Sequence, residues 1–371
     1  MLRHAVVAVA LFFACALASA ATPAVAPGNA KPEFGTLEGA AFRIDVPERW
    51  NGGLVVFFHG YAVTPVELKE GERISPMFDG MLARGFAVIQ SAYSATGWAV
   101  EEGAADTERL RKAFIAKHGA PKETFAAGMS MGGTLTVMAI ESDPDIYAGA
   151  LSLCGALEPS DRLMQRDFAL LAAFDYYFPN VLGSLDPVST SFLPTDAFIR
   201  KVTAALRKNR KGARAVQSWY GVGDLTTLPD VIAFNVYEVR EMQQRAKGNP
   251  FGNADLIYTG SGDDFALNAG VHRYRADPEA FARMARFYAP TGKLEKPLLA
   301  LHDTGDPLVP AATAFEYALA AGRAGKGGNF VQQFVNRNGH CVFRPDEIDR
   351  AFGELVEWVR DGKKPPSGKM P

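Results

Sequence analysis

Short apolar runs alternate with longer segments of helical periodicity along most of the chain. The early runs have the length of β-strands and cover residues 41–46, 54–58, 86–90, 124–127 and 148–153. The segments 99–118 and 134–141 between them have the length and composition of helices. Strands that alternate with helices predict an α/β fold with a mostly parallel central sheet and helices on both faces.

The same rhythm returns near the end of the chain. The strands and helices expected there cover residues 297–301, 311–324, 330–335 and 347–360. We therefore expect one α/β core built from residues 36–155 and 291–362. In such a sheet, ligands bind beyond the carboxyl ends of the strands.

The region between these two blocks, residues 156–290, breaks the rhythm and is expected to form mainly helices and loops. It is rich in aromatic residues: Phe168, Phe174, Tyr176, Tyr177, Phe178, Phe192, Trp219, Tyr220, Phe234 and Tyr237. An insertion of this size after a strand predicts a cap over the carboxyl edge of the sheet. Its segment 200–214 is basic and contains no acidic residue, which indicates a solvated helix face or a binding patch.

The N-terminus has the pattern of an export signal. A short basic start precedes an apolar run over residues 5–18, and Ala18-Ser19-Ala20 matches the small-x-small cleavage pattern. We expect a signal peptide over 1–20, a flexible leader over 21–35, and a secreted or periplasmic mature protein. No later segment is expected to insert stably into a membrane.

Composition is that of an ordinary globular protein. The 371 residues are 48% hydrophobic and 22% charged, and the formal net charge of −2 does not favour nucleic acid as a partner. No cluster of Cys and His has metal-ligand spacing, and no dinucleotide or P-loop fingerprint is present, so no metal or cofactor is expected.

One glycine-rich pentapeptide lies where a strand is expected to turn into a helix. Gly128-Met129-Ser130-Met131-Gly132 follows the run 124–127 and precedes the helix 134–141. A sharp turn of this kind needs glycines around the serine, because side chains there would clash, and it lifts the hydroxyl above the sheet edge. Ser130 is therefore a candidate nucleophile; the alternative is a structural turn that contains a serine.

The pentapeptide in this context resembles the nucleophile elbow of the α/β-hydrolase superfamily. The resemblance implies the chain order Ser, Asp or Glu, His, and among the histidines His340 alone fits as the general base. The acid is expected in the stretch Asp303 to Val309. Asp306, which precedes Pro307-Leu308-Val309, matches the superfamily pattern better than Asp303 does.

The resemblance also implies two backbone donors for a developing oxyanion. One is the N–H of Met131, the residue after the nucleophile. The stretch Phe57 to Tyr61 resembles the superfamily's His-Gly loop, which makes the N–H of Tyr61 the second donor. His59 is then expected to brace this loop through hydrogen bonds.

Two cysteines, Cys154 and Cys341, remain after removal of the signal peptide. They are compatible with one disulfide in an oxidising compartment or with two buried thiols. The pair His340-Cys341 resembles in part the tannase and feruloyl esterase family, whose cysteines tether the nucleophile to the histidine. Met129 stands where the serine-side cysteine of that family would be, so a tether here would need Cys154.

These features predict a serine hydrolase that cleaves small-molecule carboxylic esters through an acyl-enzyme intermediate, with apolar or aromatic groups favoured by the aromatic region. A serine peptidase of prolyl-aminopeptidase or prolyl-oligopeptidase type is the second hypothesis; Asp263 and Asp264 could hold a substrate amine. A binding module that kept the fold without catalysis is the third. The pattern leaves the oligomeric state open.

Overall fold

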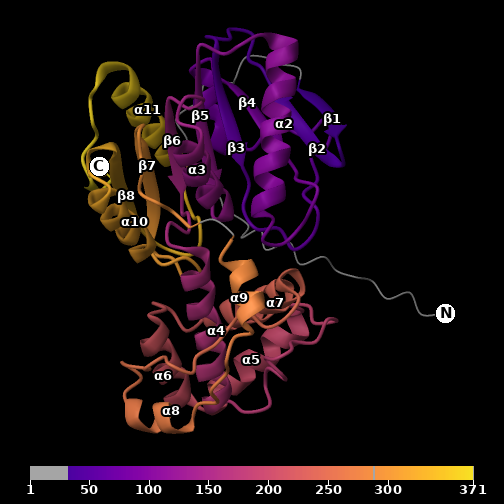
Figure 1. The fold of residues 1–371 in the computed structure, drawn as a ribbon, viewed down its shortest axis with the longest axis vertical. Helices are drawn as coiled ribbons and strands as arrows, with labels where there is room; N and C mark the ends of the chain where they lie inside the picture. The colour runs from indigo at the N-terminus through magenta and orange to yellow at the C-terminus, as the bar shows by residue number, and fades with distance from the viewer. Residues whose placement is uncertain (1–31, 287–288, 371) are drawn as a thin grey trace, which may run out of the picture. The chain divides into compact units, whose positions relative to one another are not determined.

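A computed structural model describes residues 32–286 and 289–370 (Figure 1). The expected signal peptide, residues 1–20, and most of the expected leader lie outside the described residues. The described chain forms two compact units, one made of residues 32–160 and 289–370, the other of residues 161–286. We call them the sheet unit and the helical unit and describe each by itself.

The strands of the sheet unit form one sheet in the order β1-β2-β4-β3-β5-β6-β7-β8-β9. Among the described residues the strands are β1 (Glu33–Leu37), β2 (Ala40–Asp45), β3 (Gly53–Phe58), β4 (Ala87–Ser91), β5 (Glu123–Met129), β6 (Gly149–Leu153), β7 (Leu298–Gly305), β8 (Phe330–Asn338) and β9 (Gly368–Lys369). In this order, every pair of neighbouring strands from β4 to β9 is parallel. At the other edge, β1 pairs antiparallel with β2, and β2 pairs antiparallel with β4. The predicted mostly parallel sheet is confirmed.

The first strand corrects the sequence interpretation, which assigned residues 33–35 to a flexible leader. Residues Glu33–Leu37 pair with β2, from Glu33 opposite Ile44 to Leu37 opposite Ala40. The tight connection is made by Glu38 and Gly39, which both have positive φ angles (47° and 92°). Such a two-residue connection fits the twist of an antiparallel hairpin.

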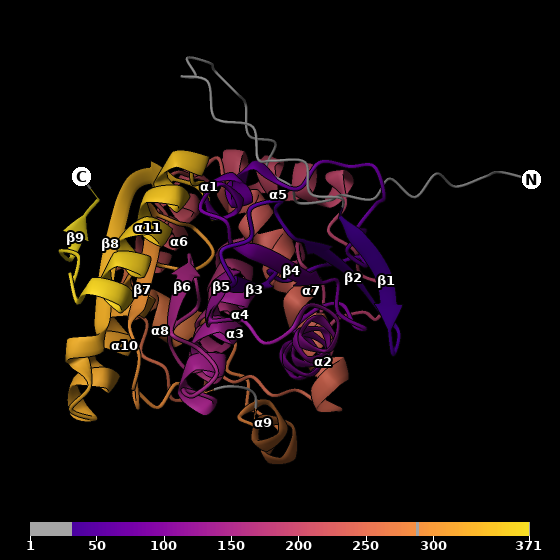
Figure 2. The same ribbon diagram turned by 90° about the horizontal axis from the view of Figure 1, so that it is seen from above.

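Helices cover both faces of this sheet (Figure 2). One face carries α2 (Val100–His118), α3 (Met131–Ser142) and α10 (Ala312–Arg323), and the other carries α1 (Asp79–Ala83) and α11 (Pro345–Asp361). Short 3-10 helices lie at Pro76–Phe78 and Gly327–Asn329. Because both faces are covered, central strands such as β3 and β6 are buried along their whole length, and Ser152 is their one polar residue.

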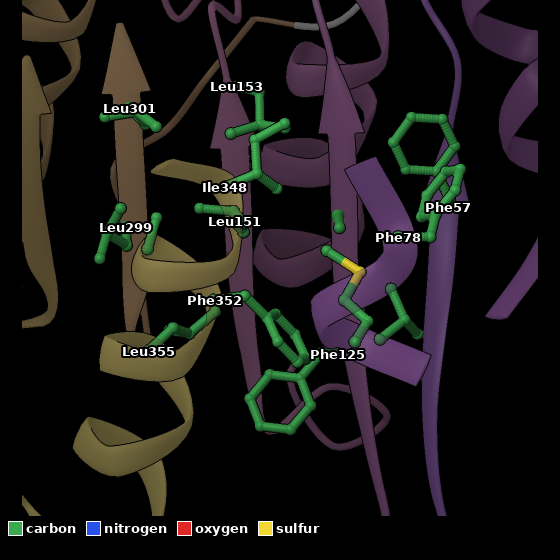
Figure 3. Packing of buried hydrophobic residues seen from close by; sticks show 14 of the residues in the cluster. Phe57, Phe78, Phe125, Leu151, Leu153, Leu299, Leu301, Ile348, Phe352 and Leu355 are labelled. Atoms are coloured by element: carbon green, nitrogen blue, oxygen red, sulfur yellow. The ribbon is translucent and has the colours of Figure 1, made fainter. Parts of the chain in front are cut away.

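The core between α11 and the sheet is built from large side chains (Figure 3). Ile348, Phe352 and Leu355 of α11 lie against the side chains of β5, β6 and β7. The rings of Phe125 and Phe352 meet edge to face, with centroids 5.5 Å apart. The candidate site is built at the carboxyl ends of these strands.

The helical unit contains no strand within residues 161–286, as the sequence predicts for the inserted region. Its helices are α4 (Ser160–Tyr177), α5 (Asp196–Lys208), α6 (Arg210–Tyr220), α7 (Leu228–Ala246), α8 (Asp264–Gly270) and α9 (Pro278–Met284). All ten aromatic residues singled out from the sequence are buried or half-buried here. Pairs such as Phe168 and Phe251, stacked at 5.3 Å, build the core of this unit.

The basic segment 200–214 runs along α5 and α6, and its lysine and arginine side chains are exposed. This is the arrangement expected of a solvated helix face. None of the helices within the described residues is both apolar enough and long enough to cross a lipid bilayer.

Candidate active site

Ser130 occupies the turn between β5 and α3, with the unusual backbone angles φ 57° and ψ −124°. The neighbouring glycines are required by close backbone contacts. A Cβ atom on Gly128 would lie 2.1 Å from the carbonyl oxygen of Gly132, and one on Gly132 would lie 2.0 Å from that of Phe58. The turn therefore has the strained strand-to-helix geometry that presents a serine hydroxyl above a sheet edge.

His340 lies in the loop after β8 and contacts Ser130 and Asp306 at once. Its Nε2 is 2.8 Å from Oγ of Ser130, and its Nδ1 is 2.7 Å from Oδ2 of Asp306. The structure thus brings together three residues that are 34 to 210 positions apart in the chain. With the Nδ1 proton donated to Asp306, the Nε2 lone pair faces the serine hydroxyl.

Asp306 is buried, and both of its carboxylate oxygens accept hydrogen bonds, Oδ1 from the loop after β7 and Oδ2 from His340. The backbone N–H groups of Leu308 and Val309 donate to Oδ1, each at 2.9 Å. Burial works against the charged carboxylate, but His340 and His302 outweigh it and hold the pKa of Asp306 below its usual range.

The pKa of His340 is raised. Burial lowers it, but the charge and hydrogen bond of Asp306 more than compensate, with a further contribution from the carboxyl of Asp303. His340 is thereby made a stronger base than a free imidazole.

Asp303, the other acid considered from the sequence, plays a different part. It is fully buried at the end of β7, and its Oδ2 accepts a hydrogen bond of 3.0 Å from the backbone N–H of Val342. Burial raises the pKa of Asp303 to about 6. Asp303 therefore anchors the loop that carries His340, while the direct contact with the imidazole belongs to Asp306.

The loop after β3 is fastened beside Ser130. A Cβ atom on Gly60 would lie 3.1 Å from Cβ of Ser130, so this loop packs directly against the candidate nucleophile. The ring of His59 stacks on that of Tyr93, with centroids 3.7 Å apart, and the Tyr93 hydroxyl donates to the carbonyl oxygen of His59 at 3.2 Å. Burial lowers the pKa of His59 to about 4, so its imidazole is neutral at physiological pH.

The two predicted oxyanion donors belong to these two segments. Tyr61 follows Gly60 in the fastened loop, and Met131 is the first residue of α3. Backbone N–H groups in the first turn of a helix have no partner within the helix, and that of Met131 is one of these. Tyr93 was missed in the sequence because a single tyrosine after a strand carries no pattern; the structure reveals it through its contacts with His59 and its positive φ angle of 56°.

Cys154 and Cys341 are joined by a disulfide, with their Cα atoms 5.4 Å apart. The disulfide is therefore the alternative realised, in place of two thiols. It links the end of β6 to the residue after His340, and Sγ of Cys341 lies 3.4 Å from Nε2 of His340. The His340 loop is thus held by a covalent bond, by Asp303 and by Asp306.

Proteins with similar sequences or structures indicate the fold of this chain. No family model matches the chain. An o-phthalyl amidase of Xanthobacter agilis is 22% identical over 90% of this chain and 88% of its own length. Among solved structures, the acylaminoacyl peptidase of Pyrococcus horikoshii is 14% identical with a TM-score of 0.46; the alignment covers 90% of this chain but 42% of the peptidase.

A protein assigned as a dipeptidyl aminopeptidase IV, from Bacteroides ovatus, is 11% identical with a TM-score of 0.50. The alignment covers 90% of this chain and 36% of that protein, so the chain spans less than half the length of these two peptidases. Together with the strand order and the position of Ser130 between β5 and α3, this likeness shows that the chain has the fold of the α/β-hydrolase superfamily.

Proposed function

We propose that the chain is a serine hydrolase that cleaves carboxylic esters through an acyl-enzyme intermediate. The observation that carries the proposal is the hydrogen-bonded series from Ser130 through His340 to Asp306, built on the strained turn after β5. A serine hydroxyl is a weak nucleophile until an adjacent base accepts its proton, and this series supplies one.

In the proposed reaction, Oγ of Ser130 attacks the ester carbonyl carbon while Nε2 of His340 accepts the hydroxyl proton. Asp306 holds the imidazole in the tautomer that this transfer needs and stabilises the imidazolium that forms. The imidazolium then gives its proton to the leaving alcohol, and the C–O bond of the ester breaks. A water molecule attacks the acyl-enzyme by the same steps and releases the acid and the free Ser130.

The negative charge of the tetrahedral intermediate needs fixed donors. We assign this role to the backbone N–H groups of Met131 and Tyr61. The N-terminus of α3 also carries the positive end of the helix dipole, which favours an anion beside Ser130. Stacking and hydrogen bonding between Tyr93 and His59 keep the Tyr61 loop in place without the need to reorganise during the reaction.

The choice of an ester rests on chemistry more than on a visible acyl pocket. Compared with amides, esters have the better leaving group and need less assistance from the general acid. The aromatic residues of the helical unit give less support than the sequence suggested, because they pack into that unit's core. We retain small apolar or aromatic esters as the first substrate class to test.

A second candidate is amide hydrolysis, favoured by the o-phthalyl amidase relative that matches over most of the chain. The same triad cleaves amides when the leaving amine is protonated efficiently by the imidazolium. The aminopeptidase version of this hypothesis loses support. Asp263 caps α8 by accepting from the N–H of Ala266, and Asp264 accepts from Gly260 and Ser261, so both carboxylates are engaged locally.

Export is part of the proposal. The apolar N-terminal segment and the Cys154–Cys341 disulfide both fit an oxidising compartment outside the cytoplasm. Fractionation of expressing cells with N-terminal sequencing should find a mature chain that begins at Ala21; a cytoplasmic chain that begins at Met1 would contradict export.

The substrate experiment compares p-nitrophenyl acetate and butyrate with aminoacyl anilides and a chromogenic o-phthalyl amide. The mature protein is measured beside Ser130→Ala. We expect ester turnover that the variant loses. Turnover of amides with little ester turnover would replace the first candidate by the second, and turnover that survives in Ser130→Ala would refute both.

A further inference from the structure

Three atoms with metal-ligating chemistry converge beside Ser130. Sγ of Cys154, Sγ of Cys341 and Nε2 of His340 lie within 4.8 Å of one another. In the disulfide form, the two sulfurs are bonded to each other and provide no thiolate, so a metal ion finds only the imidazole. Reduction would change the ligand set at this point without any change of sequence.

We propose that reduction of the Cys154–Cys341 disulfide opens a binding site for a soft divalent metal ion, Zn²⁺ or Cd²⁺, held by both thiolates and by Nε2 of His340. Thiolate and imidazole are the ligands that these ions prefer. This metal site exists only after reduction of the disulfide, and the proposed hydrolytic reaction does not use it.

The distances fit such an ion. Metal–sulfur bonds of about 2.3 Å and metal–nitrogen bonds of about 2.0 Å in a tetrahedron separate the ligand atoms by roughly 3.5 to 3.8 Å. Sγ of Cys341 is already 3.4 Å from Nε2 of His340. The two sulfurs need only move apart by side-chain rotation, since their Cα atoms are 5.4 Å apart.

The two cysteines stay anchored by contacts that do not depend on the disulfide. The backbone N–H of Cys154 donates to the carbonyl oxygen of Leu301 at 2.8 Å. Next to Cys341, the N–H of Val342 is held by Asp303, and its carbonyl oxygen accepts from Arg337. Cys154 is buried, whereas Cys341 and His340 are half-buried, so reagents would arrive from the Cys341 side.

The chemistry balances with a phosphine as the reductant. The phosphine breaks the S–S bond, gives up two electrons and becomes the phosphine oxide with an oxygen from water, whose protons complete two thiols. The metal ion then displaces one proton from each thiol and takes the lone pair of Nε2, while water or Ser130 completes the tetrahedron. Since that lone pair must accept the Ser130 proton during hydrolysis, the metal-bound protein is inactive.

The test uses Co²⁺ as a spectroscopic probe on the mature protein, with and without phosphine. We expect thiolate-to-cobalt charge-transfer absorption and tetrahedral visible bands at one ion per chain in the reduced protein alone. The Cys154→Ser/Cys341→Ser double variant, treated in the same way, should lack the charge-transfer absorption. His340→Ala should keep it but shift the visible bands, a readout that does not need activity.

The second readout is hydrolysis, which rests on the proposed function. One equivalent of Zn²⁺ should lower the activity of the reduced protein at least tenfold, leave the oxidised protein unaffected, and be reversed by a chelator. The proposal is overturned if the reduced, folded protein shows two free thiols and no charge-transfer absorption. Unfolding on reduction also overturns it, because the ligands are then not held together. Cobalt binding without any hydrolase activity would refute the proposed function and leave the metal site standing.

Discussion

Each unit of the molecule contains a buried carboxyl group with a strongly shifted pKa, Asp306 in one and Glu238 in the other, and the two shifts have opposite directions. In the sheet unit, Asp306 accepts three N–H donors, from Leu308, Val309 and His340, and its pKa is held below its usual range. In the helical unit, Glu238 is equally buried, and its Oε2 has no hydrogen-bond partner. Burial, followed by the nearby carboxyls of Asp167 and Glu241, raises the pKa of Glu238 well above its usual value.

The comparison shows that burial alone does not decide the charge of an acid. The neighbouring charges and hydrogen bonds decide it: His340 and His302 favour the carboxylate of Asp306, whereas around Glu238 the carboxyls of Asp167 and Glu241 add to the effect of burial and outweigh Arg166. In the proposed reaction, a charged Asp306 beside His340 supports catalysis, whereas Glu238 in the core of the helical unit should affect stability alone.

The largest effect is expected from Asp306→Asn. The amide cannot hold the imidazole in the productive tautomer, so kcat should fall by about 10⁴-fold with the fold intact. The matched control is Asp303→Asn, which keeps an acceptor for the N–H of Val342 and replaces an acid with a pKa of about 6. Its loss should stay within about tenfold. A larger loss in Asp303→Asn than in Asp306→Asn would reverse the assignment of the two acids.

The pH dependence of hydrolysis should follow His340. The base must be neutral to accept a proton, and its pKa is raised, so kcat/KM should rise with pH through an inflection above 6.5. In Asp306→Asn the residual activity should show this inflection at lower pH, because the carboxylate that favours the charged imidazole is gone. A profile that is flat over this range would mean that His340 is not the base.

A smaller effect is expected from Tyr93, which contacts His59 in the loop after β3 that carries the proposed donor Tyr61. Tyr93→Phe keeps the stack on His59 but loses the hydroxyl that donates to its carbonyl oxygen. Loosening a preorganised donor should lower kcat by about three- to tenfold with KM little changed. Tyr317→Phe, which loses a hydrogen bond to Glu141 elsewhere in the sheet unit, should leave kcat unchanged. Equal losses in both variants would indicate a general effect of destabilisation.

The smallest effect on activity is expected in the helical unit. Glu238→Gln should leave kcat unchanged and stabilise the protein, relative to wild type, increasingly as the pH rises above the ordinary pKa of a glutamate. The folded chain keeps on Glu238 a proton that the unfolded chain loses, so the native protein's stability falls with rising pH in this range, and glutamine removes that slope. Denaturant unfolding at several pH values measures this pH dependence of the free energy of unfolding. The control is Glu279→Gln, a substitution of an exposed glutamate. A parallel pH dependence in wild type and Glu238→Gln would contradict the raised pKa.

The sequence predicted most of the sheet unit because its signals are local. Strands that are buried on both faces, such as β3 and β6, are recognised in the sequence by their high content of apolar residues. Gly128 and Gly132 indicate the tight turn around Ser130. The strand β1 was not predicted. Glu33–Leu37 lies at the edge of the sheet, has no fully buried residue and therefore lacks the apolar run of a central strand.

The remaining features depend on contacts between distant parts of the chain. The pattern Pro307-Leu308-Val309 favoured Asp306 over Asp303 as the acid, but the contact between Asp306 and His340 became visible only in the structure. Tyr93 acquires its role through the ring of His59, which no periodicity reveals. The aromatic residues of the helical unit could not be divided into core and ligand-binding residues until their burial was known.

The central claim, that Ser130 is a nucleophile activated by His340, is tested most directly by a fluorophosphonate probe with mass spectrometry of the labelled peptides. The account predicts one adduct, on the peptide that contains Ser130, and loss of labelling in Ser130→Ala and in His340→Ala with folding retained. An adduct on another serine, or no adduct on the folded wild-type protein, would contradict it.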